Sequence, residues 1–269
     1  MERIDKVLAH QGYGTRKDVK KLLRTACVTL NGKQIFDPAT HIDLGADTLS
    51  IDGKTIALQH DVYLMMNKCK DVVCANRDGE HRTVFDLLAP DLRHSFLGGD
   101  LHHVGRLDID TEGLLILTTD GALTHRLISP KTHIPKTYAV RLRDSVDQPT
   151  RAAYTKKFAS GLHIEREGNE AEFDAQAAEL VWLCDGAGEN AADGQNAIDA
   201  TDAKNAAGCD CLLTIYEGKF HQVKRMFAAV GNEVTYLKRV AMGALKLDAT
   251  LAAGEYRALT AEEIRLLRK

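Results

Sequence analysis

The sequence predicts an α+β protein made of a small N-terminal unit and a larger second unit. The first 58 residues contain two helix-like patterns followed by hairpin-like strands, which is typical of a small separate unit. The remaining chain intersperses strand-like apolar runs with short amphipathic helices. With 269 residues, of which 44% are hydrophobic and 27% charged, the chain can bury a sizeable core.

Composition and charge exclude several classes of protein. A formal net charge of −3 argues against a uniformly basic nucleic-acid binder, although local basic faces remain compatible with it. No apolar run approaches the length of a membrane span, and the N-terminus lacks the apolar core of a signal peptide. The six cysteines show no framework spacing, so we expect reduced thiols in a cytoplasm and no metal site.

Within residues 1–58, apolar spacing predicts a first helix at the N-terminus. Thr15 is a suitable N-cap for a second helix over residues 16–25. A hairpin around Asn31-Gly32 and a further strand over residues 48–51 follow. The second helix is strongly basic, and a solvated face is the usual explanation for such a charge run.

Four elements of this segment, in order, resemble the small RNA-binding domain of ribosomal protein S4. They are Arg3-Ile4-Asp5-Lys6, Gly14-Thr15-Arg16, the basic helix, and the turn from Val28 to Gly32. The resemblance implies an S4-like RNA-binding domain, in which phosphate contacts position the protein on RNA. The side chains that would face the phosphates are Arg3, Lys6, Arg16, Lys17 and Lys20.

A short linker over residues 55–62 is expected to join this domain, residues 1–58, to a second domain over 62–269. In the second domain, strands are predicted over 62–68, 114–117, 136–142, 177–183, 211–216, 234–239 and 245–247, and helices over 83–88, 122–128, 151–160, 223–230 and 261–267. The acidic segment 185–208 has almost no large apolar residue, so we expect a disordered insertion there.

The stretch from Gly105 to Gly121 sets several ionisable groups directly before a strongly apolar run, Leu114 to Leu117. A loop anchored on a buried strand can hold a reactive side chain rigidly. On composition alone an ordinary solvated loop is favoured. The specific string of residues favours a functional loop instead.

Several ordered motifs of the second domain resemble the pseudouridine synthases, and the RsuA-type branch fits best. The motifs are Gly105-Arg106-Leu107-Asp108 with Asp110 to Gly121, Lys136-Thr137-Tyr138, Glu217 to Phe227, and Gly254 to Glu263. Such a set is far more specific than any one motif. The resemblance implies a catalytic domain with a mixed, mainly antiparallel sheet, flanking helices and a central cleft.

The resemblance also implies the reaction, which isomerises a uridine of ribosomal RNA to pseudouridine without any cofactor. Asp108 would be the nucleophile or base that acts on the ribose of a flipped-out uridine. Tyr138 would stack on the uracil, and Lys224 would keep Asp108 ionised. Because no second carboxylate is singled out as a general acid, a glycoside hydrolase is disfavoured.

Other residues of these motifs receive supporting roles. Arg106 would hold the RNA backbone or fill the gap left by the flipped base, and Arg225 is expected to contact RNA or to replace Lys224 as the cation. His221 and Gln222 are expected beside the site. The remaining acidic residues of the stretch are expected to be ordinary loop and turn carboxylates, namely Asp110, Glu112 and Asp120.

The preferred substrate is small-subunit 16S rRNA or an assembly intermediate that contains it, and the protein is expected to act as a monomer away from membranes. Two alternatives stay open: the same reaction on 23S rRNA, and a non-catalytic rRNA-binding protein. A pure binder would have no reason to keep the set of Asp108, Tyr138 and Lys224.

Overall fold

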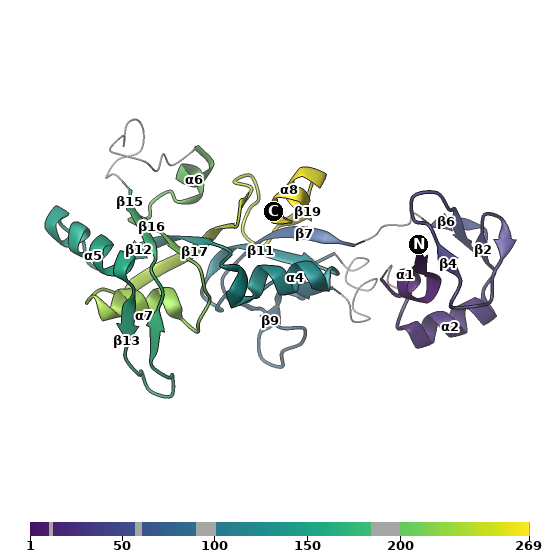
Figure 1. Cartoon of the computed structure of the whole chain (residues 1–269), viewed down its shortest axis with the longest axis horizontal. Coiled ribbons are helices and arrows are strands. Elements are labelled where there is room, and N and C mark those ends of the chain that lie inside the picture. Colours follow the sequence, from purple (N-terminus) through teal and green to yellow (C-terminus); the bar gives the residue numbers. More distant parts are fainter. Residues whose placement is uncertain (11–12, 57–60, 90–100, 184–199, 269) are drawn as a thin grey trace.

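The computed structural model describes residues 1–10, 13–56, 61–89, 101–183 and 200–268. Up to residue 56 the chain forms a small α+β unit with its own sheet (Figure 1). Its elements are β1 (Glu2–Arg3), α1 (Ile4–His10), α2 (Arg16–Thr25), β2 (Val28–Leu30), β3 (Lys33–Gln34), β4 (His41–Ile42), β5 (Leu49–Ile51) and β6 (Lys54–Ile56). The sheet order is β3-β2-β5-β6, and β1 pairs with β4.

Local sequence explains this unit in the way that was predicted. The Thr15 hydroxyl accepts from the Asp18 amide, and the Asp18 carboxylate accepts from the Thr15 amide, so a capping box begins α2. Asn31 and Gly32 both have positive φ, which forms the tight turn between β2 and β3. The expected linker begins too early, because β6 extends to Ile56; residues 57–60 lie outside the described residues.

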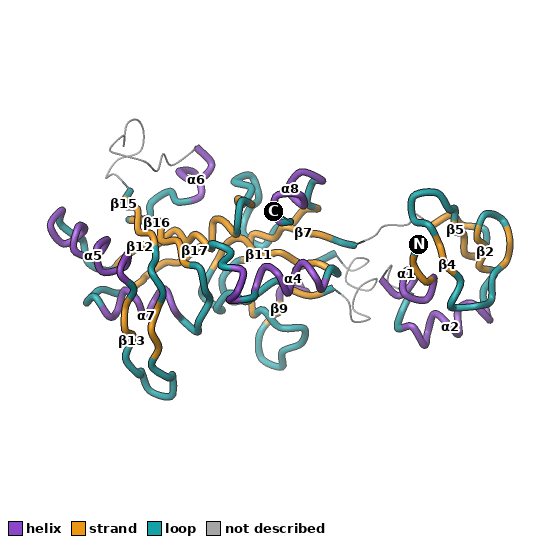
Figure 2. Tube along the Cα trace, viewed as in Figure 1, coloured by secondary structure: helices purple, strands orange, loops and turns teal. Residues whose placement is uncertain are grey.

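The larger unit is organised on one sheet with the strand order β15-β16-β12-β17-β11-β7-β19 (Figure 2). Its strands are β7 (Tyr63–Lys68), β11 (Glu112–Thr118), β12 (Lys136–Leu142), β15 (Glu179–Trp182), β16 (Cys211–Ile215), β17 (Val234–Met242) and β19 (Tyr256–Ala258), with β10 (His102–His103) beside β11 and β18 (Leu245–Lys246) beside β17. Only β11 and β17 of these pairs run parallel. The expected mixed, mainly antiparallel sheet is therefore confirmed.

Helices cover both faces of this sheet. They are η1 (Val84–Leu87), α4 (Gly121–Ile128), η2 (Pro130–Thr132), α5 (Gln148–Ser160), α6 (Ala200–Asn205), α7 (Gln222–Ala229) and α8 (Ala261–Leu267). Two short pairs lie outside the main sheet, β8 (Val72–Val73) with β9 (Arg82–Thr83), and β13 (Leu162–Ile164) with β14 (Phe173–Ala175). The helices expected near residues 122–128, 151–160, 223–230 and 261–267 are confirmed, whereas the one at 83–88 is a single 3-10 turn.

Alternate residues of the central strands enter two separate cores. In β11, Leu115 and Leu117 join the core that includes α5 and α7, whereas Leu114 and Ile116 join the core that includes α4 and α8. This alternation follows from the two-residue period of a strand. It leaves the loop before β11 attached to a strand that is buried on both faces.

The prediction of disorder over 185–208 is wrong for its last part. Residues 200–205 form α6, and Asn205 and Ala206 are buried. The Asn205 amide donates to the Leu247 carbonyl oxygen at 2.8 Å, and Ala206 packs beside Ala139 and Val240. Small side chains suffice here because the neighbouring strand residues fill the space. Residues 185–199 lie outside the described residues.

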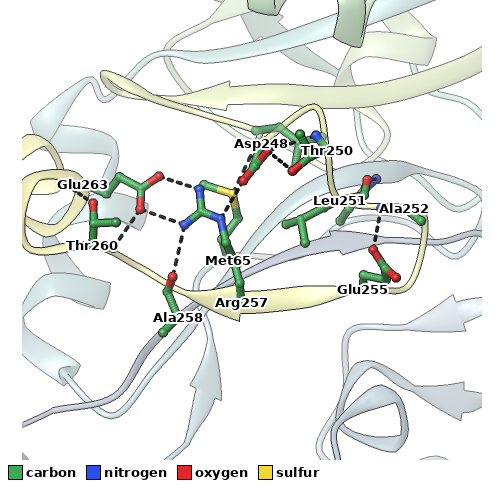
Figure 3. A network of polar contacts seen from close by, with 12 residues as sticks. Met65, Asp248, Thr250, Leu251, Ala252, Glu255, Arg257, Ala258, Thr260 and Glu263 are labelled. Carbon is green, nitrogen blue, oxygen red and sulfur yellow. Dashed lines mark hydrogen bonds and ion pairs between the residues drawn. The ribbon is translucent and has the colours of Figure 1, made fainter.

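Arg257 of β19 connects the C-terminal elements (Figure 3). Its guanidinium donates to Asp248 at 2.7 Å and to Glu263 at 2.7 and 2.8 Å, and Glu263 completes the capping box of Thr260 at the start of α8. Hydrogen bonds from Thr250 and from Arg257 lower the pKa of Asp248 to about 2. Within the described ranges, no helix has the length and apolar character needed to cross a membrane.

Candidate active site

A pocket with about 430 Å³ of empty space opens between the loop before β11 and the loop before α7. Its lining includes Asp108 and Tyr138, which the sequence predicts as catalytic, and Arg106, His221 and Gln222, which it predicts beside the site. The volume is within the range of ligand pockets. The structure thus brings five predicted residues from three distant parts of the chain to one cavity.

Asp108 lies between two basic side chains from the beginning of α7. Its Oδ2 atom is 3.5 Å from Lys224 Nζ and 3.7 Å from His221 Nε2. The carboxylate is 29% exposed and the lysine 25% exposed, so the pair is only partly screened by solvent. The predicted neighbourhood of Asp108 and Lys224 is present in the structure.

Lys224 is shared with a second carboxylate that the sequence analysis placed in an ordinary loop. Its Nζ donates to both oxygens of Asp110 at 2.7 and 2.8 Å, closer than to Asp108. Burial opposes the ionisation of Asp110, but the hydrogen bonds from Lys224 hold the pKa of that carboxyl below its usual value. Asp110 therefore orients the lysine that faces Asp108.

The loop that carries Asp108 is a tight turn held from below by Lys68. The Thr111 amide donates to the Asp108 carbonyl oxygen at 3.1 Å. Lys68 Nζ donates to that same oxygen at 3.0 Å, and to the carbonyl oxygens of Thr111 at 2.9 Å and Cys69 at 3.0 Å. Burial lowers the pKa of Lys68, which is fully buried at the end of β7. The turn is thus positioned by a buried cation and three backbone acceptors.

Tyr138 forms part of the pocket wall from the middle of the sheet. It lies on β12, opposite Leu213 of β16, and is 8% exposed. Ile215 and Leu237 line the pocket beside it, so the wall is apolar where Asp108 is polar. Such a site can enclose a flat ring against Tyr138 while Asp108 and its cations stay at the edge.

The loop before α7 is closed by its own side chains. Gln222 donates to Glu217 Oε1 at 2.7 Å and accepts from the Lys219 amide at 3.0 Å. Glu217 also accepts from the Gln176 amide at 2.9 Å. His221 has φ of 50°, a backbone conformation that an L-residue adopts only when its surroundings hold it there. The Glu217–Gln222 pair therefore positions His221 at the pocket.

Arg225 does not face the pocket or the solvent, so its predicted contact with RNA is wrong. It is 5% exposed, and its guanidinium donates to the carbonyl oxygens of Glu165 and Ala171 at 2.8 and 2.9 Å. The guanidinium also lies 4.7 Å from the centre of the Phe173 ring. One helical step turns Arg225 away from Lys224, and it anchors the segment joining β13 and β14 instead.

The predicted cations of the N-terminal unit divide into two groups. Arg3 forms two hydrogen bonds with Asp5 at 2.8 and 3.1 Å, and Lys6 is 3.0 Å from Glu2. By contrast, three predicted cations of α2 are exposed, namely Arg16, Lys17 and Lys20. The exposed group offers the stronger positive surface for a polyanion.

The other acidic residues of the stretch have structural partners. Glu112 accepts from the Tyr236 hydroxyl at 2.6 Å, and Asp120 caps α4 while accepting from the Tyr63 hydroxyl at 2.8 Å. Among the described residues, no cluster of His, Cys, Asp or Glu side chains could hold a metal ion. The chemistry of the pocket therefore depends on Asp108 and the basic and aromatic groups around it.

Two buried cations near the site were missed by the sequence analysis. Lys68 ends an apolar strand, and that position was its only signal. Arg239 of β17 is 2% exposed, donates to the Leu114 carbonyl oxygen at 2.8 Å, and leaves its Nη2 atom without a hydrogen-bond partner. Nothing in a single sequence distinguishes such residues from exposed cations at strand ends.

Comparisons with known proteins agree with this site. A family model described as RNA pseudouridylate synthase matches residues 62–229, which contain Asp108, Tyr138 and Lys224. An uncharacterized RNA pseudouridine synthase of Bacillus subtilis (strain 168) is 40% identical over 265 residues, covering 98% of each chain. Ribosomal small subunit pseudouridine synthase A of Escherichia coli (strain K12) is 37% identical over 263 residues, covering 97% of this chain and 98% of that protein.

A solved structure agrees with both comparisons. The crystal structure of a pseudouridylate synthase has 34% sequence identity and a TM-score of 0.60, and the match covers 99% of this chain and 100% of the other. The fold, the pocket and the full-length similarity lead to one family. The chain belongs to the RNA pseudouridylate synthases and is an isomerase of that family.

Proposed function

We propose that this enzyme converts a uridine of small-subunit 16S ribosomal RNA to pseudouridine. The observation that carries the proposal is the pocket in which Asp108 faces Lys224 and His221 beside the Tyr138 wall. The choice of small-subunit rRNA is supported by full-length similarity to the small-subunit enzyme of Escherichia coli. Action on rRNA implies a cytoplasmic protein, and the five cysteines of the described residues are free thiols.

The reaction breaks the bond between C1′ of the ribose and N1 of uracil and forms a bond between C1′ and C5. The C5 proton leaves and N1 gains a proton, so the product is an isomer and no electron or group donor is consumed. Asp108 acts on the ribose, either as the nucleophile at C1′ or as the base at C2′. Lys224 and His221 surround its carboxylate with positive charge or hydrogen-bond donors, which favours the ionised form.

Tyr138 holds the flipped base during the reaction. Its ring lies in the pocket wall with Ile215 and Leu237, where a uracil can stack and turn without meeting water. Arg106, an exposed cation on the pocket lining, contacts the RNA backbone or the gap left by the flipped nucleotide. Polar and charged groups thus lie at the rim, and the apolar wall faces the base.

Residues 1–58 act as an S4-like RNA-binding domain, and residues 62–269 carry the chemistry. The exposed face of α2 supports this role, because Arg16, Lys17 and Lys20 can neutralise RNA phosphates. Such contacts carry little sequence information. The domain therefore raises affinity for RNA, while the pocket selects the uridine.

The test is a map of pseudouridines in rRNA from cells that lack this gene, compared with cells in which the gene is restored. We expect one site in 16S rRNA to be lost and to return with the restored gene. Loss of a site in 23S rRNA would overturn the substrate assignment and leave the reaction in place. An unchanged rRNA map, with no turnover of purified rRNA, would favour the non-catalytic binder.

A further inference from the structure

Phe220 is an exposed aromatic residue at the mouth of the catalytic pocket. Its side chain is 51% exposed, and it is one of five large apolar side chains exposed in the described parts of the chain. It lies between Lys219 and His221, which both line the pocket. A second exposed apolar residue, Ile109, directly follows Asp108. Isolated apolar residues on a surface are ordinary, but two of five at one pocket mouth indicate a binding surface.

The ring of Phe220 is held in a defined orientation. It stacks on the His221 imidazole, with ring centroids 3.7 Å apart and an interplanar angle of 30°. His221 in turn has the positive φ described above, and its Nε2 atom is 3.7 Å from Asp108 Oδ2. The three side chains form a row that leads from the carboxylate to the surface. The row therefore begins where the ribose reacts and ends on an aromatic ring.

The row is built on a loop that does not move freely. The Glu217–Gln222 hydrogen bond closes the loop on which Phe220 lies, and both of these side chains are buried. An exposed ring on a rigid loop loses little conformational entropy when it binds a flat partner. A mobile surface phenylalanine would lack this advantage.

A uridine that leaves its helix to enter the pocket exposes the flat faces of its neighbours. An aromatic side chain can cover such a face by stacking, in a manner that tolerates any base. We propose that Phe220 is a stacking platform for the nucleobase next to the target uridine in the RNA strand. The inference rests on the proposed function, since it assumes that a flipped uridine occupies the pocket.

The proposal gives Phe220 a role in binding and not in the chemical step. A ring that stacks on a neighbouring base contributes equally before and during the reaction, so its loss should raise KM and leave kcat at saturating RNA nearly unchanged. Stacking is worth about 1–3 kcal/mol per base, which corresponds to an increase of about 5- to 140-fold in KM for Phe220→Ala.

The decisive experiment is a double-mutant cycle between the protein and the RNA. An rRNA fragment that the wild-type enzyme modifies is made with an abasic residue on either side of the target uridine. For one of the two positions, we expect the abasic change to raise KM of the wild-type enzyme and to have little further effect on Phe220→Ala. Fully additive effects at both positions would overturn the proposal.

Matched variants separate stacking from a purely structural role. Phe220→Tyr and Phe220→Trp should keep a low KM, whereas Phe220→Leu should behave like Phe220→Ala, because leucine is apolar without a flat ring. Ile128→Ala, another exposed apolar residue, should change neither constant. A fall in kcat at constant KM for Phe220→Ala would show that the ring acts only by orienting His221, and would contradict the platform.

A wrong choice of rRNA is distinguishable from a wrong inference about Phe220. The cycle uses whichever fragment the wild-type enzyme modifies, so a switch from 16S to 23S rRNA would change the proposed function alone. Circular dichroism of each variant shows whether the fold is retained. If Phe220→Ala does not fold, the comparison of Phe220→Leu with Phe220→Trp carries the same test.

Discussion

At the scale of single residues, Lys224 shows how the site balances its charges. A cation in the first turn of a helix is unfavourable, because the positive end of the helix dipole lies there. Two carboxylates offset this cost, since Asp110 binds the Lys224 ammonium directly and Asp108 lies 3.5 Å away. The motif around Lys224 indicated an anionic partner, and the structure shows that part of this partner is within the protein.

Lys136 is a second residue whose environment opposes its charge. It is buried, and its Nζ donates to the Ile134 carbonyl oxygen at 3.0 Å. Burial, with a smaller contribution from the nearby Arg239, lowers the pKa of Lys136 to about 8. A lysine whose pKa is lowered in the folded state destabilises the fold below that value, and the destabilisation is relieved as the pH rises from about 8 towards 10.5.

We therefore predict that Lys136→Met raises the free energy of unfolding at pH 7 by about 1–3 kcal/mol, after allowing for the lost hydrogen bond. The gain should shrink as the pH rises above about 8. Urea denaturation of both proteins between pH 7 and pH 10 measures this difference. A gain that stays constant over this range would show that lost charge is not its cause.

Residues of the site differ in how far the sequence predicts them. Asp108 and Tyr138 could be placed together because they belong to motifs that resemble one family. Lys68 and Arg239 could not, since their role depends on which backbone carbonyl oxygens the fold brings to them. Arg225 was misplaced because adjacent helical positions point in different directions, and sequence alone did not show which one is buried.

At the scale of elements, Gly113 determines how close β11 and β17 can approach. It has φ of 102°, and an added Cβ would lie 2.8 Å from the Arg239 backbone nitrogen and in contact with the Arg239 carbonyl oxygen. This glycine starts the parallel pairing of the two strands, directly after the loop that holds Asp108. A side chain here would push the strands apart.

We predict that Gly113→Ala lowers the free energy of unfolding by at least about 2 kcal/mol, because both the backbone conformation and the close contact oppose a Cβ. Gly121→Ala is the matched control, since Gly121 begins α4 and its added Cβ would meet nothing within 4 Å. Thermal and urea denaturation of both variants compare the two sites. Equal stability of the two variants would contradict the role given to Gly113.

Most helices and strands follow from local sequence, and the exceptions have physical causes. Caps such as Thr15 and Thr260 act through the nearest turn, so they are visible in the sequence. The helix α6 was missed because its sequence is poor in large apolar residues and its stability comes from tertiary contacts, such as the bond from Asn205 to Leu247. Its composition resembles that of a disordered segment, although its end is buried.

At the scale of the whole molecule, the parallel pairing of β11 and β17 could not be derived from strand patterns. Each strand reads as a buried run, and either direction of pairing satisfies that pattern. The family resemblance supplied the mixed sheet, and the observed strand order confirms it. The roles of Asp108, Tyr138 and Lys224 and the two domain boundaries stay predictions.

The division of labour between the two units gives a further prediction. Replacing Arg16, Lys17 and Lys20 together by serine should weaken RNA binding and reduce the slope of log affinity against log salt by up to about 2, because each phosphate contact contributes about 0.7 on single strands. The value of kcat at saturating RNA should stay close to that of the wild type. Filter binding at several salt concentrations measures the slope.

A matched triple variant controls for the change in net charge. Lys156→Ser, Lys157→Ser and Arg265→Ser remove three exposed cations from the larger unit. Their loss should change the salt slope less than the loss of the α2 cations. A larger effect of this second triple variant would place the main RNA-binding surface outside α2.

The central claim is that Asp108 performs the chemistry, and release of tritium from C5-labelled uridine in rRNA tests it most directly. We predict that Asp108→Asn reduces the rate by at least about 10²-fold while RNA binding is retained. Asp110→Asn should keep measurable turnover, because Asp110 is more exposed and binds Lys224. Near wild-type turnover of Asp108→Asn, or a loss confined to Asp110→Asn, would contradict the account.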